Sequence, residues 1–276
     1  MSEYVKGELI YYAHTLSRKF KELIIYPISD IHIGNPMFSK HHFNKTMDFV
    51  LSHDNCFVIL NGDLAECVTK DSKGNIWKQT MPPAQQKKEL KKLLKPLKGR
   101  VLGCTMGNHE ERIADKCSFD ITGEIAEELG CPYRPAGILL KVTFGDGNNR
   151  SQGQPYTYFI YATHGYGGAR TKGAKAAKIE RPSAWIHADA YIMSHDHETA
   201  LLPAVYLMPD PRTHLDEDTG FRIGKVKSTN KKLVKSHAYL KWGEYAEAKG
   251  HGPVSLEPSF LKLQGTGKPA VHAEMW

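Results

Sequence analysis

The chain has 276 residues, of which 41% are hydrophobic and 24% are charged, an ordinary composition for a globular protein with a full core. No apolar run is long enough to span a bilayer, and the first 20 residues lack the pattern of a secretory signal, so we expect a cytoplasmic protein. The net charge of +7 and the isoelectric point near 9.0 favour a polyanionic partner. Five scattered cysteines without a CxxC pair argue against a zinc knuckle or a disulfide framework.

The first part of the chain alternates apolar runs with amphipathic stretches. Residues 1–20 show no clear period and are interpreted as an extension or a short helix. The predicted elements that follow are a strand at 21–29, a helix at 39–53, a strand at 56–63, a helix at 82–98 and a strand at 100–110. This alternation predicts βαβ units and a largely parallel sheet.

The rest of the chain continues with less regular spacing. A helix is predicted at 119–130, followed by strands at 136–144, 155–163 and 189–195. Beyond residue 200, short strand-like pieces are separated by proline, glycine and charge. We therefore expect one domain over residues 1–276, with an N-terminal extension at 1–20 and C-terminal strands and a tail at 200–276.

Potential metal ligands follow each of the strong predicted strands. In chain order they are Asp30 and His32, Asp63, Asn108 and His109, His164, and His195 and His197. Ligand sites in open α/β sheets form beyond the carboxyl ends of the strands, so five strand ends would deliver these side chains to one edge. The sequence therefore predicts a metal centre at that edge.

The residue types indicate which ions this centre would bind. Carboxylate, amide oxygen and imidazole together suit manganese first, with iron, zinc or nickel as alternatives, rather than calcium or a thiolate-bound ion. Two such ions held roughly 3.5–4 Å apart polarise a phosphoryl group and lower the pKa of a bridging water, which yields hydroxide near neutral pH. We expect two divalent ions and phosphoester hydrolysis.

The order of these motifs resembles the calcineurin-like metallophosphoesterases, and specifically a small stand-alone member of the kind that bacteriophages encode. The matching stretches are Asp30-Ile31-His32, Gly62-Asp63 with Glu66, Gly107-Asn108-His109-Glu110, His164-Gly165 and His195-Asp196-His197. The resemblance covers roughly residues 22 to 200. It implies an α/β fold in which a sandwich of two β-sheets is flanked by helices.

The same resemblance implies a role for each ligand. Asp30, His32 and His197 would hold one ion, whereas Asn108, His164 and His195 would hold the other, and Asp63 would bridge the two. His109 would lie beside the substrate, where it stabilises the transition state or protonates the leaving oxygen. Glu66 falls where some members place a carboxylate that orients this histidine; the alternative is a plain surface acid.

Two positions depart from the family pattern. Ser194 stands where glycine usually precedes the His-x-His motif, and since a small residue is kept we expect little effect. Protein serine/threonine phosphatases of this superfamily carry an arginine shortly after the bridging aspartate, whereas Asp63 is followed by LAECVT. A protein phosphatase is therefore disfavoured.

Basic residues near the motifs are candidate substrate contacts. Arg170, Lys172 and Lys175 lie in the segment 164–178 directly after a predicted ligand, and Arg112 follows the Gly-Asn-His motif. They could bind phosphates that flank the scissile one, or belong to a solvated surface. We expect a phosphodiesterase acting on nucleic acid or nucleotides; the alternatives are a phosphomonoesterase on a small metabolite and a non-catalytic metal-binding protein. The sequence does not indicate an oligomeric state.

Overall fold

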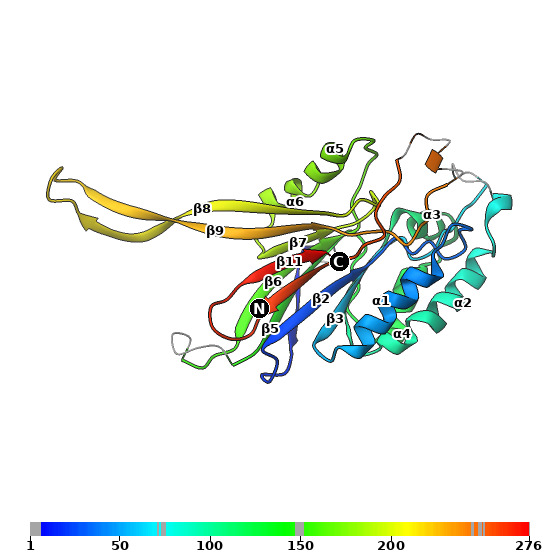
Figure 1. Cartoon of the computed structure of the whole chain (residues 1–276), viewed down its shortest axis with the longest axis horizontal. Helices are drawn as coiled ribbons and strands as arrows, with labels where there is room; N and C mark the ends of the chain where they lie inside the picture. The colour runs from blue at the N-terminus through cyan, green and yellow to red at the C-terminus, as the bar shows by residue number, and fades with distance from the viewer. Residues whose placement is uncertain are drawn as a thin grey trace.

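The structure is a computed structural model that describes residues 7–70, 72, 76–146, 152–243, 246–247, 250 and 252–275. Two β-sheets form its centre (Figure 1). The first has the strand order β1 (Tyr11–Thr15), β5 (Ile138–Phe144), β6 (Tyr156–Thr163), β7 (Ala190–Met193), β9 (Arg222–Lys235) and β8 (Ala200–Leu215). The second has the order β11 (Val271–Met275), β10 (Ser259–Gln264), β2 (Glu22–Ile28), β3 (Cys56–Asn61) and β4 (Val101–Thr105).

Helices cover the outer faces of both sheets. They are α1 (Lys40–Ser52), α2 (Pro83–Leu94), α3 (Asn108–Cys117), α4 (Ile121–Leu129), α5 (Lys172–Ala177) and α6 (Glu180–Trp185), with 3-10 turns η1 (Ile76–Lys78) and η2 (Lys95–Leu97). Residues of α1 to α4 pack on the five-stranded sheet, and the segment around α5 and α6 packs on the six-stranded sheet. The predicted fold class, a two-sheet sandwich flanked by helices, is confirmed.

Strand β2 shows why the apolar runs were continuous rather than alternating. Its residues Ile24, Tyr26 and Ile28 face the helices, whereas Leu23 and Ile25 face the other sheet. A strand buried on both faces has no polar positions, which is typical of the central strands of a layered fold. β2, β3 and β4 run parallel, as the strand–helix alternation predicted, and β10 joins β2 antiparallel.

Both ends of the chain differ from the prediction. Residues 11–15 form β1, which pairs parallel with β5 at the edge of the six-stranded sheet, instead of an extension or a short helix. Beyond residue 200, β8 and β9 are long strands of 16 and 14 residues rather than short pieces. β10 and β11 are short strands, as expected, and complete the five-stranded sheet. Hydrogen bonds to neighbouring strands thus stabilise segments whose sequence alone shows no clear period.

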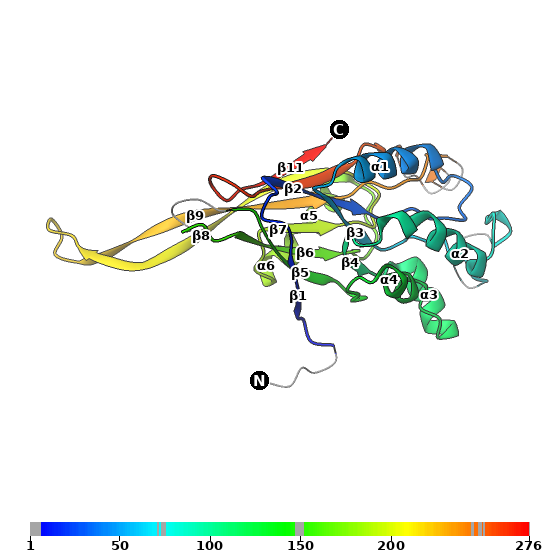
Figure 2. The same ribbon diagram turned by 90° about the horizontal axis from the view of Figure 1, so that it is seen from below.

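Strands β8 and β9 form an antiparallel ribbon, here called the arm, which projects far beyond the sandwich (Figures 1 and 2). At its base, Leu201 and Val234 pack in the core between the sheets. Farther out, apolar side chains on the same ribbon face are exposed, and Leu207 is 72% exposed. The arm therefore extends the six-stranded sheet, and no other described residues cover the exposed apolar side chains of its outer part.

Two further expectations concern cysteines and membranes. All five cysteines are free, and Cys56, Cys67 and Cys104 are buried. None of the helices in the described part of the chain is long and apolar enough to cross a membrane.

Candidate metal centre

The seven predicted ligands follow the carboxyl ends of five strands, β2, β3 and β4 in one sheet and β6 and β7 in the other. Within each sheet these strands run parallel to one another, so their carboxyl ends lie at one edge. The structure brings all seven together there: Asp30, His32, Asp63, Asn108, His164, His195 and His197.

Turns with left-handed backbone place most of these side chains. The φ angles are 49° at Asp30, 50° at His32, 49° at Asp63, 74° at His195 and 55° at His197. For residues with a Cβ this conformation costs roughly 1–2 kcal/mol each, so the surroundings have to support it. The first two turns support each other, because Asp30 N donates to the Gly62 oxygen and His32 N to the Asp63 oxygen, both at 3.0 Å.

The first ligand cluster contains Asp30, His32 and His197. The Nε2 atoms of the two histidines are 3.1 Å apart, and His197 Nε2 is 3.2 Å from Asp30 Oδ1. Asp30 Oδ1 is buried and accepts no hydrogen bond from the residues described. Because His32 donates from Nδ1 to Glu66 Oε2 at 2.9 Å, its Nε2 is the ring atom that faces the cluster. A carboxylate oxygen and two ring nitrogens thus converge, an arrangement that a bound cation would stabilise.

The second cluster contains Asp63, His164 and His195, together with the amide oxygen of Asn108. Backbone carbonyls fix both ring tautomers: His164 Nδ1 donates to the Asn61 oxygen and His195 Nε2 to the Gly167 oxygen, each at 2.8 Å. The other ring nitrogens therefore face the cluster, where each can take a proton or a metal ion. His164 Nε2 lies 3.1 Å from Asp63 Oδ2 and 3.3 Å from both Asn108 Oδ1 and His195 Nδ1.

The electrostatics of the centre favour positive charge at these ring nitrogens. Burial lowers the pKa of His32, but the hydrogen bond to Glu66 and the surrounding carboxylates raise it to about 9. Burial likewise lowers the pKa of His164, but the charge and hydrogen bond of Asp63 raise it to about 10. Burial raises the pKa of Asp63, yet the neighbouring histidines hold it well below its usual value. Protons and metal ions would therefore compete for the same atoms.

His109 lies beside the clusters and is more accessible than most of the ligands, with 20% of its side chain exposed. Its Nδ1 donates to the backbone oxygen of Glu66 at 2.7 Å, which leaves Nε2 facing Asp63 Oδ2 at 3.8 Å. Burial lowers the pKa of His109 to about 4, so the ring is neutral at pH 7. The Glu66 carboxylate is 3.8 Å from His109 but 2.9 Å from His32. It is therefore the Glu66 carbonyl that orients His109, while the Glu66 carboxylate orients His32.

Glu110 has a role that the sequence did not indicate. It lies in the first turn of α3, and its carboxylate is fully buried. It accepts hydrogen bonds from the backbone N–H groups of Asp63, Ala65 and Gly107 at 3.1, 2.7 and 3.1 Å. One side chain thus joins the turns after β3 and β4. Its place as the third residue of the helix, the capping-box position, was the available signal.

A buried ion cluster, also missed, lies behind the His-x-His motif. The Asp196 carboxylate contacts Lys178 Nζ at 2.5 Å and Lys235 Nζ at 2.6 Å. Lys178 also donates to the Gly167 oxygen at 3.0 Å, the same oxygen that accepts from His195. In the sequence these lysines look like ordinary surface charges, because nothing in their spacing shows that they converge.

The departure at Ser194 is accommodated in the manner expected of a small residue. Its side chain is buried, and its Oγ accepts from Asn61 Nδ2 at 2.6 Å and lies 2.7 Å from Ser236 Oγ. Asn61 also accepts from the Thr105 hydroxyl at 2.8 Å. This hydrogen-bond chain links β3, β4 and the turn after β7 directly beneath the ligands.

The predicted substrate contacts lie in different environments. Arg170 is exposed, and Lys172 is exposed but forms an ion pair with Glu198 at 3.1 Å. Lys175 is buried and lies 3.6 Å from Glu198, so it faces an internal acid. Arg112 donates from Nε to the Asn108 carbonyl at 3.1 Å, one turn away in α3. Part of the segment 164–178 is helical, since α5 spans Lys172–Ala177.

The donor set fits divalent metal ions. Both clusters combine carboxylate and imidazole ligands, the second adds the amide oxygen of Asn108, and no thiolate is among them, a donor set that suits manganese, iron or zinc. Asp30 Oδ1 is buried without a hydrogen-bond partner among the residues described, which a bound cation would supply. Asp63 Oδ2 lies 3.1 Å from His164 Nε2 and 3.9 Å from His32 Nε2, so one oxygen reaches both clusters.

The chain is similar in structure to several solved proteins, although the sequence comparisons found no match. No protein-family model and no curated protein sequence matches the chain. Vps29 from Chaetomium thermophilum is similar with a TM-score of 0.41 at 10% identity, covering 92% of this chain and 97% of that one. A metallophosphoesterase from Sphaerobacter thermophilus has a TM-score of 0.38 at 12% identity, covering 92% and 88%. A predicted phosphoesterase from Streptococcus pneumoniae has a TM-score of 0.36 at 10% identity, and the match covers 93% of this chain and 99% of that one.

Proposed function

We propose that the chain is a dinuclear metal-dependent phosphoester hydrolase, and that its substrate is a phosphodiester of a nucleic acid or a nucleotide. The observation that carries the proposal is the convergence of buried carboxylate, amide and imidazole groups in two adjoining clusters, with the accessible imidazole of His109 beside them. One of these atoms, Asp30 Oδ1, accepts no hydrogen bond from the residues described, and an unsatisfied buried polar atom is costly. The arrangement is better explained by a bound cation.

The ligands divide between two ions. Asp30, His32 and His197 would hold one, Asn108, His164 and His195 the other, and Asp63 would contact both. Manganese is the first candidate, with iron, zinc or nickel as alternatives. When bound, two such ions supply positive charge that polarises the phosphoryl oxygens and lowers the pKa of water.

His109 would act on the substrate directly. The Glu66 carbonyl holds the proton of Nδ1, so Nε2 is the atom that faces the centre. With its pKa lowered to about 4 by burial, the ring is neutral at pH 7 before substrate binds. A phosphoester anion beside the ring raises this pKa, because an opposite charge stabilises the imidazolium. The proton on Nε2 would then be available to the leaving oxygen.

Basic residues support an extended anionic substrate. Arg170 and Lys172 are exposed in the segment that follows His164, and the chain carries a net charge of +7. Such groups bind phosphates that flank a scissile bond. A phosphomonoesterase acting on a small metabolite is the second candidate, because the pairing of Lys172 and Lys175 with Glu198 leaves less free positive charge than the sequence suggests.

The proposal is tested by hydrolysis of bis-p-nitrophenyl phosphate and p-nitrophenyl phosphate with added Mn²⁺, followed by DNA, RNA and nucleotide substrates. We expect cleavage of the diester and metal binding near two ions per chain. Asp63→Asn should lose metal and nearly all activity, because the shared ligand loses its charge. Asp115→Asn, a matched change on the exposed side of α3, should behave as the unmodified protein.

His109→Gln separates metal binding from turnover. It should retain metal but lower kcat by about 10²–10⁴-fold on a substrate with an alkoxide leaving group, because proton donation contributes that much. The loss should be smaller for p-nitrophenolate, which needs no proton to leave. Cleavage of the monoester alone would establish the second candidate. Two bound ions without cleavage of either ester would overturn catalysis and leave a metal-binding protein.

A further inference from the structure

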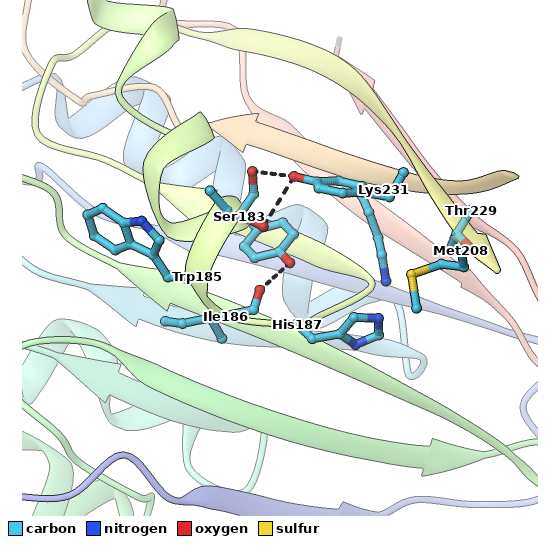
Figure 3. Close-up of a pocket in the computed structure, with 10 residues that line it drawn as sticks. Ser183, Trp185, Ile186, His187, Met208, Thr229 and Lys231 are labelled. Atoms are coloured by element: carbon cyan, nitrogen blue, oxygen red, sulfur yellow. Dashed lines mark hydrogen bonds between the residues drawn. The ribbon is translucent and has the colours of Figure 1, made fainter.

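A pocket lies at the end of β7 opposite to the metal centre. It has a volume of about 180 Å³ and lies between the end of α6 and the base of the arm (Figure 3). His187 and Tyr191 line it near the amino end of β7, whereas His195 and His197 follow the carboxyl end. The pocket is therefore separate from the proposed phosphoesterase site.

Lys231 of β9 places an ammonium group in this pocket. Its side chain is 3% exposed, and Nζ is buried without a hydrogen-bond partner in the part of the chain that is described. Nζ forms an ion pair with Asp189 Oδ1 at 3.6 Å, a separation beyond hydrogen-bond distance. The other Asp189 oxygen already accepts from Phe159 N at 2.8 Å. A buried ammonium with unused hydrogens favours a ligand that offers an anionic oxygen.

The remaining walls favour a flat apolar group. The hydroxyls of Tyr191 and Tyr206 are already bonded, to the Ile186 oxygen and to Ser183, so these residues present their rings. Figure 3 shows His187 and Met208 on either side of the Lys231 ammonium. A cavity of about 150 Å³ is large enough for benzene, so this pocket holds one ring.

We propose that this pocket binds a small aromatic carboxylate, with the carboxylate on Lys231 Nζ and the ring beside His187 and Met208. A neutral ring would leave the ammonium with the distant Asp189 contact and no hydrogen-bond acceptor among the described residues. A small inorganic anion would leave the aromatic and thioether walls in water. In an aromatic carboxylate, one molecule provides an anionic oxygen for the Lys231 ammonium and a ring for the apolar walls.

Benzoate is the probe, titrated into the full chain in the presence of a chelator so that no ion at the metal centre binds the carboxylate. Carbon-13 labelled methionine methyl groups report the site, because a ring beside Met208 shifts its methyl resonance. Met208→Leu assigns that resonance by its disappearance. We expect benzoate to shift it, and benzamide, which has the same shape without charge, to bind at least about tenfold more weakly, the equivalent of one charged hydrogen bond.

Lys231→Met should lower the benzoate affinity by a similar factor. The matched control is Lys232→Met, whose side chain lies on the opposite face of the strand and does not line the pocket. Equal binding of benzoate and benzamide to the unmodified chain would overturn the proposal even if Lys231→Met failed to fold. An unmoved Met208 resonance would overturn it as well. Neither result depends on phosphoesterase activity, so this proposal and the proposed function can fail separately.

Discussion

The ring nitrogens of His32 and His164 can carry either a proton or a metal ion, and this competition makes stability depend on pH. In the folded chain the pKa of His32 is raised to about 9 and that of His164 to about 10, against about 6.5 for an ordinary histidine. Their contribution to folding is therefore fully present below pH 6.5 and is lost as pH rises through 9 to 10.

We predict that the metal-depleted chain loses stability between pH 6.5 and pH 10. The loss should be on the order of 1 kcal/mol for each unit by which the pKa is raised, measured as the free energy of unfolding in urea with a chelator present. His32→Gln should reduce this dependence, whereas His272→Gln, at an exposed position of β11, should not. Stability that stays constant or rises over this range would contradict the assignment.

The sequence predicted which side chains gather at the centre but not how they are held. Asp63 and His164 could be identified because each follows an apolar run, and parallel strands end at one edge. The partner of the Glu66 carboxylate could not be identified from the sequence, because it depends on whether the side chain reaches His32 or His109. The three hydrogen bonds that Glu110 accepts from the backbone could not be predicted either. Two of the donors lie 45 and 47 residues from Glu110 in the chain, and the third is Gly107, directly before the helix.

At the scale of elements, the short helix α5 supports the His-x-His turn through a single lysine. Lys178, at its carboxyl end, contacts both Asp196 and the Gly167 oxygen that fixes the tautomer of His195. Such outer partners of metal ligands typically contribute 10- to 100-fold to metal affinity. Lys178 is therefore a positioning residue that touches neither the ligand atoms nor the substrate.

We predict that Lys178→Met weakens Mn²⁺ binding by about 10- to 100-fold, measured by calorimetric titration of the metal-depleted chain. Asp196 would keep Lys235 as its partner, so the change should not leave the carboxylate unpaired. Lys172→Met, on the exposed side of the same helix, is the control and should leave the affinity unchanged. If both variants bind Mn²⁺ as the unmodified chain does, the positioning role is wrong.

The arm shows why some strands cannot be predicted from the sequence. Strand prediction relies on one buried face, and most of the arm has none. Pro203, Pro209 and Pro211 also interrupt the pattern of β8. Proline is tolerated there because β8 is an edge strand that pairs only with β9. The buried strands β2 and β3 were predicted correctly for the opposite reason, since both of their faces are covered.

For the molecule as a whole, the outer arm should be dispensable for folding. Residues 210–225 contribute no buried side chain to any of the core clusters, and the ion pairs of Asp210 are with exposed Arg212 and Lys227. Ion pairs with such exposed cations contribute little stability. The sandwich and the metal centre are thus expected to form without them.

We predict that replacing residues 210–225 with Asn-Gly changes the free energy of unfolding by less than about 1 kcal/mol, because Pro209 and Val226 are already paired and Asn-Gly favours a tight hairpin turn. Urea denaturation and Mn²⁺ titration are the measurements. Loss of metal binding, or a loss of stability of several kilocalories per mole, would show that the arm is part of the folding unit.

The arm also changes how the protein moves in solution. Sixteen residues of extended strand reach about 50 Å, whereas a compact chain of 276 residues has a radius of gyration of about 19 Å. Friction depends on the longest dimension as well as on mass, so this 31.0 kDa chain should diffuse and sediment more slowly than a sphere of equal mass. A gel-filtration column calibrated with compact proteins would therefore overstate its mass, and a single chain would elute at the position of a larger species.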